Sequence, residues 1–277
     1  MSKNSGDVWS QQRDVDPAVL PLFDQLIEVT DALHKCPSRQ NPELEDRLQE
    51  LWRKFRDLVA EGKRIHPQTA VTLELRLLSL ERFDEAEFMT RHLLTLQPRS
   101  IESLCFYGST LVRSGRYRVA EEVYEQAIDS CRAILKDKNV DLDQLLSDSS
   151  DAGGQRGMIL RAMFLDTGDV YERLARVQIL QGKLEEGATS AQRAQKLHLI
   201  GELPKSEPWR LWGEVQLRLG NVEESRTALR NALLINTSQE GDFGEPERIM
   251  KIIEVLDDDV AGAVALLDRL DEQERRA

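Results

Sequence analysis

The stretch IESLCFYGSTLVRSGRYRVAEEVYEQAIDSCRAI, residues 101–134, decides the fold of this chain. Its apolar residues, among them Leu104 and Leu111, recur at helical spacing, and the spacing resumes after a turn at Gly115. The stretch therefore predicts two helices joined by a tight turn. Ala, Leu, Glu, Gln and Arg dominate the whole chain and are strong helix formers, while aromatic residues make up only 5%, fewer than a large β-sandwich needs. The sequence predicts an all-α protein.

The pattern of residues 101–134 recurs along the chain. In three places a glycine turn is followed by a small residue five positions later, an apolar residue four positions after that, and an alanine three positions further on. The turn glycines are Gly115, Gly182 and Gly220, the small residues are Ala120, Gly187 and Ser225, and the alanines are Ala127, Ala194 and Ala232. A weaker copy begins near Pro67, with Phe83 at its turn. This recurrence is typical of a repeat protein.

These units resemble the tetratricopeptide repeat, a helix-turn-helix unit of 34 residues. The resemblance is closest for residues 101–134 and is also visible in units that begin near Gly168 and Ser206. It implies a right-handed α-α superhelical solenoid, because one unit cannot bury its apolar face and neighbouring units must stack. It also implies that Gly108 lies where the two helices of a unit nearly touch, since only a very small residue permits that approach.

Residues outside the repeats complete the predicted organisation. Asn41-Pro42 is typical of a helix start, with a capping residue before a proline at the first helical position. The run from Asp148 to Gly154 predicts a mobile loop, followed by extra helical turns from Met158. We divide the chain into a disordered leader (1–16), an N-terminal helical pair (17–62), two repeats (67–134), an insertion with a mobile acidic and glycine-rich loop (135–167), two further repeats (168–239), and a degenerate capping repeat with an acidic tail (244–277).

The net charge of the chain disfavours nucleic acids and anionic membranes as binding partners. Its formal net charge is -12 and its pI is near 5.0, so it repels phosphate backbones and lacks the basic excess that holds proteins on anionic membranes. The sequence contains no apolar run of about 18 residues, so it predicts no membrane-spanning segment. The three scattered cysteines fit a reducing compartment, so we expect a cytoplasmic protein that binds no nucleic acid and inserts into no membrane.

No catalytic motif emerges from the sequence. It contains no phosphate-binding loop, no His-Glu-x-x-His and no Gly-x-Ser-x-Gly, and its four histidines lie far apart along the chain. Cys105 and Cys131 stand inside predicted repeat helices, where a buried apolar role is more common than a nucleophilic one. We therefore predict no enzyme activity, no catalytic residue, no cofactor and no metal site.

The resemblance implies a place for a ligand, because in this family the first helix of each repeat lines a concave groove. The alternative is that the same positions form an ordinary solvated helix face. The implied partner-binding residues are Glu102, Cys105, Ser109 and Val112 in the second repeat, Asp169, Glu172, Arg176 and Ile179 in the third, and Glu207, Arg210, Glu214 and Leu217 in the fourth.

The residues at these positions favour one kind of partner. The Lys, Asn and Arg of the family's carboxylate clamp are replaced by Glu, Asp and apolar residues, so an acidic chaperone tail is disfavoured. We expect a basic or mixed-charge peptide or helix in the groove. The predicted function is a non-catalytic scaffold or adaptor for protein–protein interaction. The alternatives are a dedicated chaperone for an exported or unstable protein, a regulatory subunit of a larger complex, and self-association through exposed apolar ends.

Overall fold

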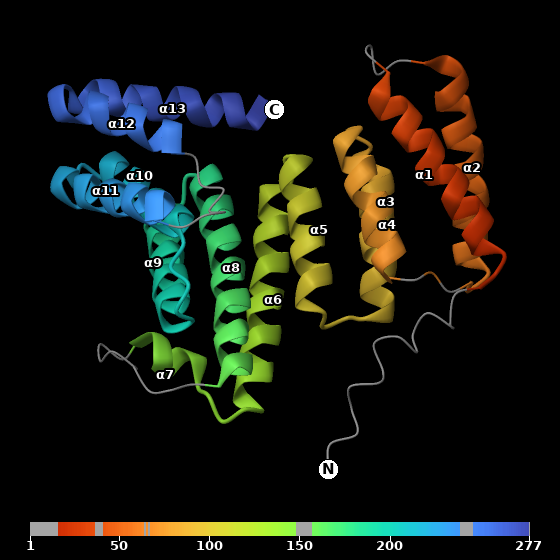
Figure 1. The fold of residues 1–277 in the computed structure, drawn as a ribbon, viewed down its shortest axis with the longest axis horizontal. Coiled ribbons are helices and arrows are strands. Elements are labelled where there is room, and N and C mark those ends of the chain that lie inside the picture. Colours follow the sequence, from red (N-terminus) through yellow and green to blue (C-terminus); the bar gives the residue numbers. More distant parts are fainter. Residues whose placement is uncertain are drawn as a thin grey trace. The chain divides into compact units, whose positions relative to one another are not determined.

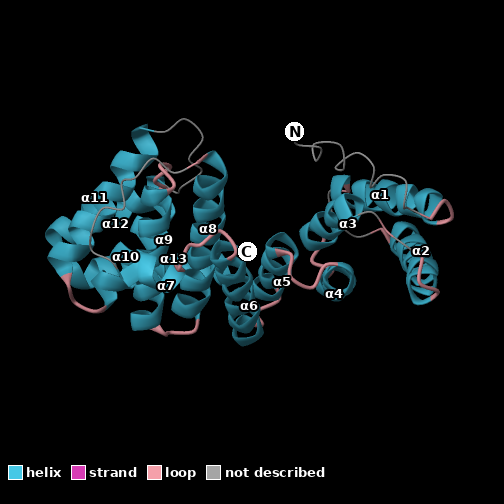
Figure 2. Cartoon of the chain, turned by 90° about the horizontal axis from the view of Figure 1, so that it is seen from below, coloured by secondary structure: helices cyan, strands magenta, loops and turns pink. Residues whose placement is uncertain are grey.

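The computed structural model describes residues 16–36, 41–63, 65, 67–147, 157–238 and 246–276. Within these ranges the chain forms thirteen α-helices and no strand (Figure 2). The prediction of an all-α chain of helix-turn-helix pairs is confirmed. The chain divides into two compact units, Met1–Pro98 and Arg99–Ala277, which are described one at a time.

Unit 1 contains four helices in two pairs. They are α1 (Val19–Lys35), α2 (Pro42–Ala60), α3 (Pro67–Ser79) and α4 (Phe83–Leu96). Helix α1 packs on α2, α3 packs on α4, and α1 also contacts α3. The predicted start of the second helix is confirmed, because the side chain of Asn41 accepts a hydrogen bond of 3.3 Å from the backbone N–H of Leu44.

Unit 2 contains the remaining nine helices of the described residues. They are α5 (Ile101–Arg113), α6 (Tyr117–Lys136), α7 (Leu142–Ser147), α8 (Met158–Leu180), α9 (Leu184–Ile200), α10 (Ser206–Arg218), α11 (Val222–Ser238), α12 (Pro246–Asp258) and α13 (Val260–Arg276). The pairs are α5 with α6, α8 with α9, α10 with α11 and α12 with α13, and each pair packs on the next. Within this unit α5, α6, α8 and α9 run side by side, and α10 to α13 cross their direction (Figure 1).

One backbone turn joins the two helices of each repeat. The φ angles of Gly115, Gly182 and Gly220 are 73°, 78° and 81°, a left-handed conformation that glycine adopts without a steric penalty. After each glycine, a backbone N–H donates to the carbonyl five residues earlier: Arg116 to Leu111 at 2.8 Å, Lys183 to Gln178 at 2.9 Å, and Asn221 to Gln216 at 2.9 Å. Between α3 and α4 the left-handed residue is Glu81, with φ of 59°. This repeat therefore lacks the turn glycine but has the same backbone turn.

The helices of a pair come closest at small residues, as the resemblance implied. A Cβ atom added at Gly108 on α5 would lie 2.5 Å from ring atoms of Tyr124 on α6. A Cβ at Gly213 on α10 would lie 2.9 Å from the side chain of Leu229 on α11. Tyr124 and Leu229 are buried, so neither ring nor side chain has free space to move into.

The predicted insertion, residues 135–167, contains helix in its described parts. Helix α6 extends to Lys136, the short helix α7 follows, and α8 begins at Met158, well before the repeat positions near Gly168. The predicted loop at Asp148 to Gly154 and the predicted leader, apart from Asp16, lie outside the described residues. The boundary between the two units falls at Pro98 and Arg99, inside the block of two repeats assigned to 67–134, where no change in composition marks it.

Replacing Gly108 by alanine tests the close approach of α5 and α6. The added methyl group must displace the buried ring of Tyr124, so we expect the Gly108→Ala variant to lose about 1–3 kcal/mol of unfolding free energy. Urea denaturation followed by circular dichroism measures the loss. Gly157→Ala is the matched control, because a Cβ there meets no atom within 4 Å. Equal stabilities of the two variants would contradict the packing at Gly108.

Candidate functional site

The predicted groove residues that reach the surface lie on the first helices of three consecutive pairs in unit 2. We call this surface the first-helix face. It is formed by Glu102, Cys105 and Ser109 of α5, Asp166, Asp169, Glu172, Arg173 and Arg176 of α8, Lys205 in the turn before α10, and Glu207 of α10. Six of the residues that sequence analysis assigned to a partner on α5 and α8 belong to it, together with Glu207.

A hydrogen bond joins α5 to α8 across this face. The Oγ atom of Ser109 accepts from Nη1 of Arg173 at 2.9 Å and lies 3.3 Å from the hydroxyl of Tyr124. Residues on both sides of this bond are exposed, including Glu102 two turns before Ser109 and Arg176 one turn after Arg173. The bond therefore holds the guanidinium of Arg173 in a fixed place between the two helices.

The thiols near this face are poor nucleophiles. Burial raises the pKa of Cys105 to about 12, against the opposing effect of Arg173. Burial likewise raises the pKa of Cys131 on α6 to about 11. Both thiols stay protonated at neutral pH, in agreement with the apolar role predicted for them.

Asp169 is the most heavily bonded carboxylate of the face. Its Oδ1 atom lies 2.5 Å from Nζ of Lys205 and 2.9 Å from Nε2 of His198, which is fully buried on α9. Burial works against its ionised form, yet hydrogen bonds from His198 and Lys205 hold the pKa of Asp169 below its ordinary value. Asp169 therefore remains a carboxylate and links three successive helical elements.

Glu172 lies one helical turn beyond Asp169 and has a different environment. Its Oε2 atom is buried and has no hydrogen-bond partner. Burial raises the pKa of Glu172 to about 8, and the nearby charges of Glu207 and Asp169 add to the effect. The side chain is therefore mostly protonated at neutral pH, because burial and the neighbouring carboxylates disfavour its ionised form.

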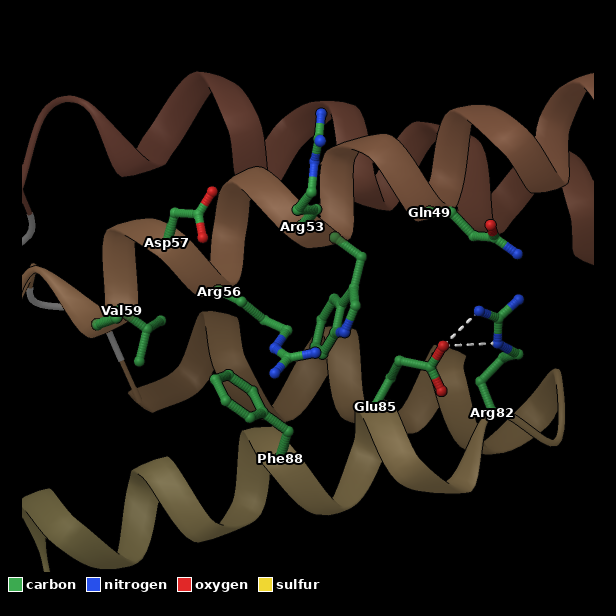
Figure 3. Close-up of a pocket in the computed structure, with 10 residues that line it drawn as sticks. Gln49, Arg53, Arg56, Asp57, Val59, Arg82, Glu85 and Phe88 are labelled. Atoms are coloured by element: carbon green, nitrogen blue, oxygen red, sulfur yellow. Dashed lines mark hydrogen bonds and ion pairs between the residues drawn. The ribbon is translucent and has the colours of Figure 1, made fainter.

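A hollow of about 530 Å³ lies in unit 1, between the second helices α2 and α4 (Figure 3). The ring of Phe88 meets Trp52 edge to face at 5.7 Å, and the guanidinium of Arg56 lies 5.5 Å from the centre of the Phe88 ring. At one end of the hollow Arg82 is paired with Glu85 and with Glu45. None of these residues belongs to the predicted site, which was placed on first helices only.

A second hollow, of about 430 Å³, lies in unit 2 and is bordered by α6, α8 and α9. Its lining includes Tyr171, the half-buried Arg132 and the exposed Arg193. The guanidinium of Arg193 lies 5.6 Å from the centre of the Tyr171 ring. Because most of its lining belongs to the second helices α6 and α9, this hollow is separate from the first-helix face.

The tetratricopeptide repeat family model matches residues 101–133, the stretch that contains α5, the Gly115 turn and most of α6. Residues 101–133 of this chain form a tetratricopeptide repeat. A comparison with curated protein sequences returned no match. None of the described helices is long and apolar enough to cross a membrane.

Solved structures show a looser likeness to this chain. The MamA RS-1 ArsTM double mutant is 16% identical, with a TM-score of 0.46 over 79% of this chain and 98% of that chain. MamA 41-end from Desulfovibrio magneticus RS-1 is 15% identical, with the same TM-score and coverages. TTC0263, a thermophilic TPR protein in Thermus thermophilus, is 14% identical, with a TM-score of 0.32 over 69% of this chain and 98% of that chain. The family assignment depends on the matched repeat and not on these likenesses.

Two side chains of the fourth repeat that were predicted to contact a partner are buried. Arg210 and Glu214 are each only 2% exposed, and Nη1 of Arg210 lies 2.6 Å from Oε1 of Glu214. Nε of Arg248 on α12 lies 2.8 Å from the same oxygen, and its Nη2 lies 2.6 Å from Asp271 of α13. The placement of Arg210 and Glu214 on an open groove is therefore corrected, because α12 and α13 cover this part of α10.

Two apolar residues predicted for the groove are also buried. Ile179 is 7% exposed and packs with the core residues of α8, α9 and α10, and Leu217 is 1% exposed in the core beneath α12 and α13. Val112 is half-buried. Both buried residues lie near the ends of their helices, where the turn brings the second helix of the pair against them.

Four residues that shape the face were not among those predicted from the sequence. Arg173 and Asp166 lie on α8, the helix that carries Asp169 and Glu172, so helical spacing alone could have included them. Lys205 stands in a turn and His198 on a second helix, and both reach the face only through the packing of α9 and α10 on α8. No local signal in the sequence marks His198 as a neighbour of Asp169.

Glu214→Gln tests whether the buried ion pairs serve stability. Loss of this charge leaves Arg210 and Arg248 facing each other in a buried place, so we expect a loss of about 3–5 kcal/mol of unfolding free energy in urea. Glu223→Gln is the control, because that side chain is 80% exposed in its pair with Arg226. An equally small effect of both variants would mean that the buried pairs do not stabilise unit 2.

The raised pKa of Glu172 predicts a pH dependence of stability. The folded state keeps the proton up to about pH 8, while the unfolded chain releases it near the ordinary pKa of 4.5. The folded state therefore binds more protons between these values, and stability falls as pH rises through this window. Lys205 and Arg173, the cations that face Glu172, reduce the effect without cancelling it.

Glu172→Gln removes this titration. In metal-free buffer we expect its melting temperature to gain several degrees on that of the native chain as pH rises from about 5 to about 8. Scanning calorimetry at a series of pH values measures the difference. Glu186→Gln, an exposed position on α9, should follow the native chain at every pH. A constant offset between Glu172→Gln and the native chain would refute the raised pKa.

Proposed function

We propose that this protein is a non-catalytic scaffold or adaptor that binds a segment of a partner protein on the first-helix face. The observation that carries the proposal is the set of polar side chains on α5, on α8 and before α10 that hydrogen bonds connect from repeat to repeat, Arg173 to Ser109 and Lys205 to Asp169. Tetratricopeptide repeats in general mediate protein–protein interaction. A surface that continues over several repeats suits an extended peptide or a helix, because such a ligand contacts every repeat along its length.

Fixed side chains on the face support binding. Arg173 is held by Ser109, and Lys205 is held by Asp169, through hydrogen bonds of 2.9 and 2.5 Å. A side chain that is already ordered loses little conformational entropy when a ligand contacts it. Exposed groups at either end, Glu102 and Arg176, leave room for further contacts.

The charges of the face favour a basic or mixed-charge segment. Burial and the neighbouring Asp169 raise the pKa of Asp166, which means that this carboxylate lacks sufficient positive charge nearby. A lysine or arginine of a partner placed against Asp166 supplies that charge. The arginines of α8 offer the complementary contact to an acidic residue further along the same segment.

Charge reversal on the face tests this proposal. We expect Asp166→Lys to weaken binding of a co-purifying partner by about tenfold or more, because it places like charges against the basic residue of the partner. A native pull-down at two salt concentrations, read by mass spectrometry, identifies the partner, and titration with that purified partner measures the affinity. Asp129→Lys on α6 is the matched control, because its side chain is 74% exposed and lies outside the face.

The two variants separate the outcomes. Loss of binding in Asp166→Lys with unchanged binding in Asp129→Lys supports the first-helix face as the site. Equal loss in both points to general electrostatics, and loss in neither places the partner elsewhere; either result rejects the proposal. A partner that is held only transiently, and whose aggregation this protein suppresses, would instead identify a chaperone.

A further inference from the structure

Two carboxylates of the first-helix face and the buried His198 lie close enough together to bind one metal ion. One carboxylate oxygen each of Asp169 and Glu172 and one ring nitrogen of His198 all lie within 4.8 Å of one another. We propose that these residues form a binding site for a divalent transition-metal ion such as Zn²⁺ or Co²⁺. No metal site was predicted from the sequence, in which the four histidines lie far apart, and His198 belongs to a different helix from the two carboxylates.

The side chains come together through the packing of one helix pair. Asp169 and Glu172 stand three positions apart on α8, so they lie on the same side of that helix. His198 reaches them from α9, across the closest approach of the pair, where its ring would touch a Cβ added at Gly168. Nε2 of His198 is 2.9 Å from Oδ1 of Asp169, which is already near the spacing of two ligands on one ion.

The unpartnered oxygen of Glu172 is the second observation that points to a cation. Glu214, a buried carboxylate on the next first helix, α10, is paired with both Arg210 and Arg248. Oε2 of Glu172 is buried and has no hydrogen-bond partner at all. A buried carboxylate oxygen without a hydrogen-bond donor is costly, and a metal ion supplies the missing bond together with more positive charge than Lys205 and Arg173 provide.

The donor set indicates the class of metal. One imidazole nitrogen and two carboxylate oxygens suit Zn²⁺ and its neighbours in the transition series, whereas Mg²⁺ and Ca²⁺ prefer oxygen ligands alone. Such an ion lies about 2.0–2.2 Å from each ligand atom. Oε2 of Glu172 has no hydrogen bond that an arriving ion would have to break.

Lys205 competes with the ion for this place. Its ammonium group lies 2.5 Å from Oδ1 of Asp169 and its side chain is 33% exposed, so it can turn out into solvent when an ion arrives. The carboxylates of Asp166 and Glu207 lie close enough to affect Asp169 and Glu172 and add to the negative potential. Removal of the Lys205 charge should therefore strengthen metal binding.

Titration of the full-length protein with metal ions tests the site directly. After treatment with a chelator, the protein is titrated with Zn²⁺ in a calorimeter and with Co²⁺ in a spectrophotometer, where visible absorption reports the coordination of the ion. We expect one site per chain, a loss of affinity of about tenfold or more in Glu172→Gln, and a gain of several-fold in Lys205→Met. Glu186→Gln should bind as the native chain does.

The directions of these changes decide the outcome. Because Lys205→Met is expected to gain affinity, a general loss of folding cannot imitate its result. The proposal fails if Glu172→Gln binds as tightly as the native chain, or if Lys205→Met binds no more tightly. A sulfur-to-cobalt charge-transfer band in the ultraviolet would place the ion on a cysteine and would also overturn the assignment. The measurement requires no partner protein, so it is independent of the proposed adaptor function.

Discussion

The two helices of a repeat approach so closely at Gly108 and Gly213 that no side chain fits between them. This close approach determines the geometry of each pair, because large residues such as Tyr124 can fill only the space beside the contact. It also fixes which side of the first helix remains available. Polar residues of α5 and α8 that the second helices leave partly exposed, such as Ser109 and Asp169, form a surface, and the hydrogen bond from Arg173 to Ser109 joins it from one repeat to the next.

In unit 2 the first-helix face ends at a buried group of ion pairs. The last pair, α12 and α13, places Arg248 and Asp271 over the fourth repeat, where they complete a buried set of ion pairs with Arg210 and Glu214. Buried charges are tolerated there because each carboxylate has a guanidinium against it. The result is a polar layer between α10 and the terminal pair, and the first-helix face stops at the beginning of α10.

Glu172, on α8, lacks the paired positive charge that Glu214 has. It is buried among Asp169 and Glu207, and no arginine is bonded to it, so its pKa is raised to about 8. Two carboxylates on successive first helices therefore have opposite properties: Glu214 stabilises the fold through paired charge, and Glu172 has an unsatisfied oxygen. Perturbed groups of this second kind are common at functional sites, where a ligand supplies what the fold does not.

The sequence by itself determined the helices, their turns and the repeat. Gly115, Gly182 and Gly220 mark turns that need a left-handed backbone, and helical spacing assigned Asp169, Glu172 and Arg176 to one side of α8. These are local properties, set by backbone sterics and by a period of 3.6 residues per turn.

Only the tertiary structure decided which of those residues stay exposed and which meet. Helices α12 and α13 buried Arg210 and Glu214, and the packing of α9 on α8 brought His198 to Asp169. The boundary at Pro98 was equally invisible in the sequence. The physical reason is that burial and contact depend on elements far apart along the chain, and the spacing within one helix carries no record of what covers it.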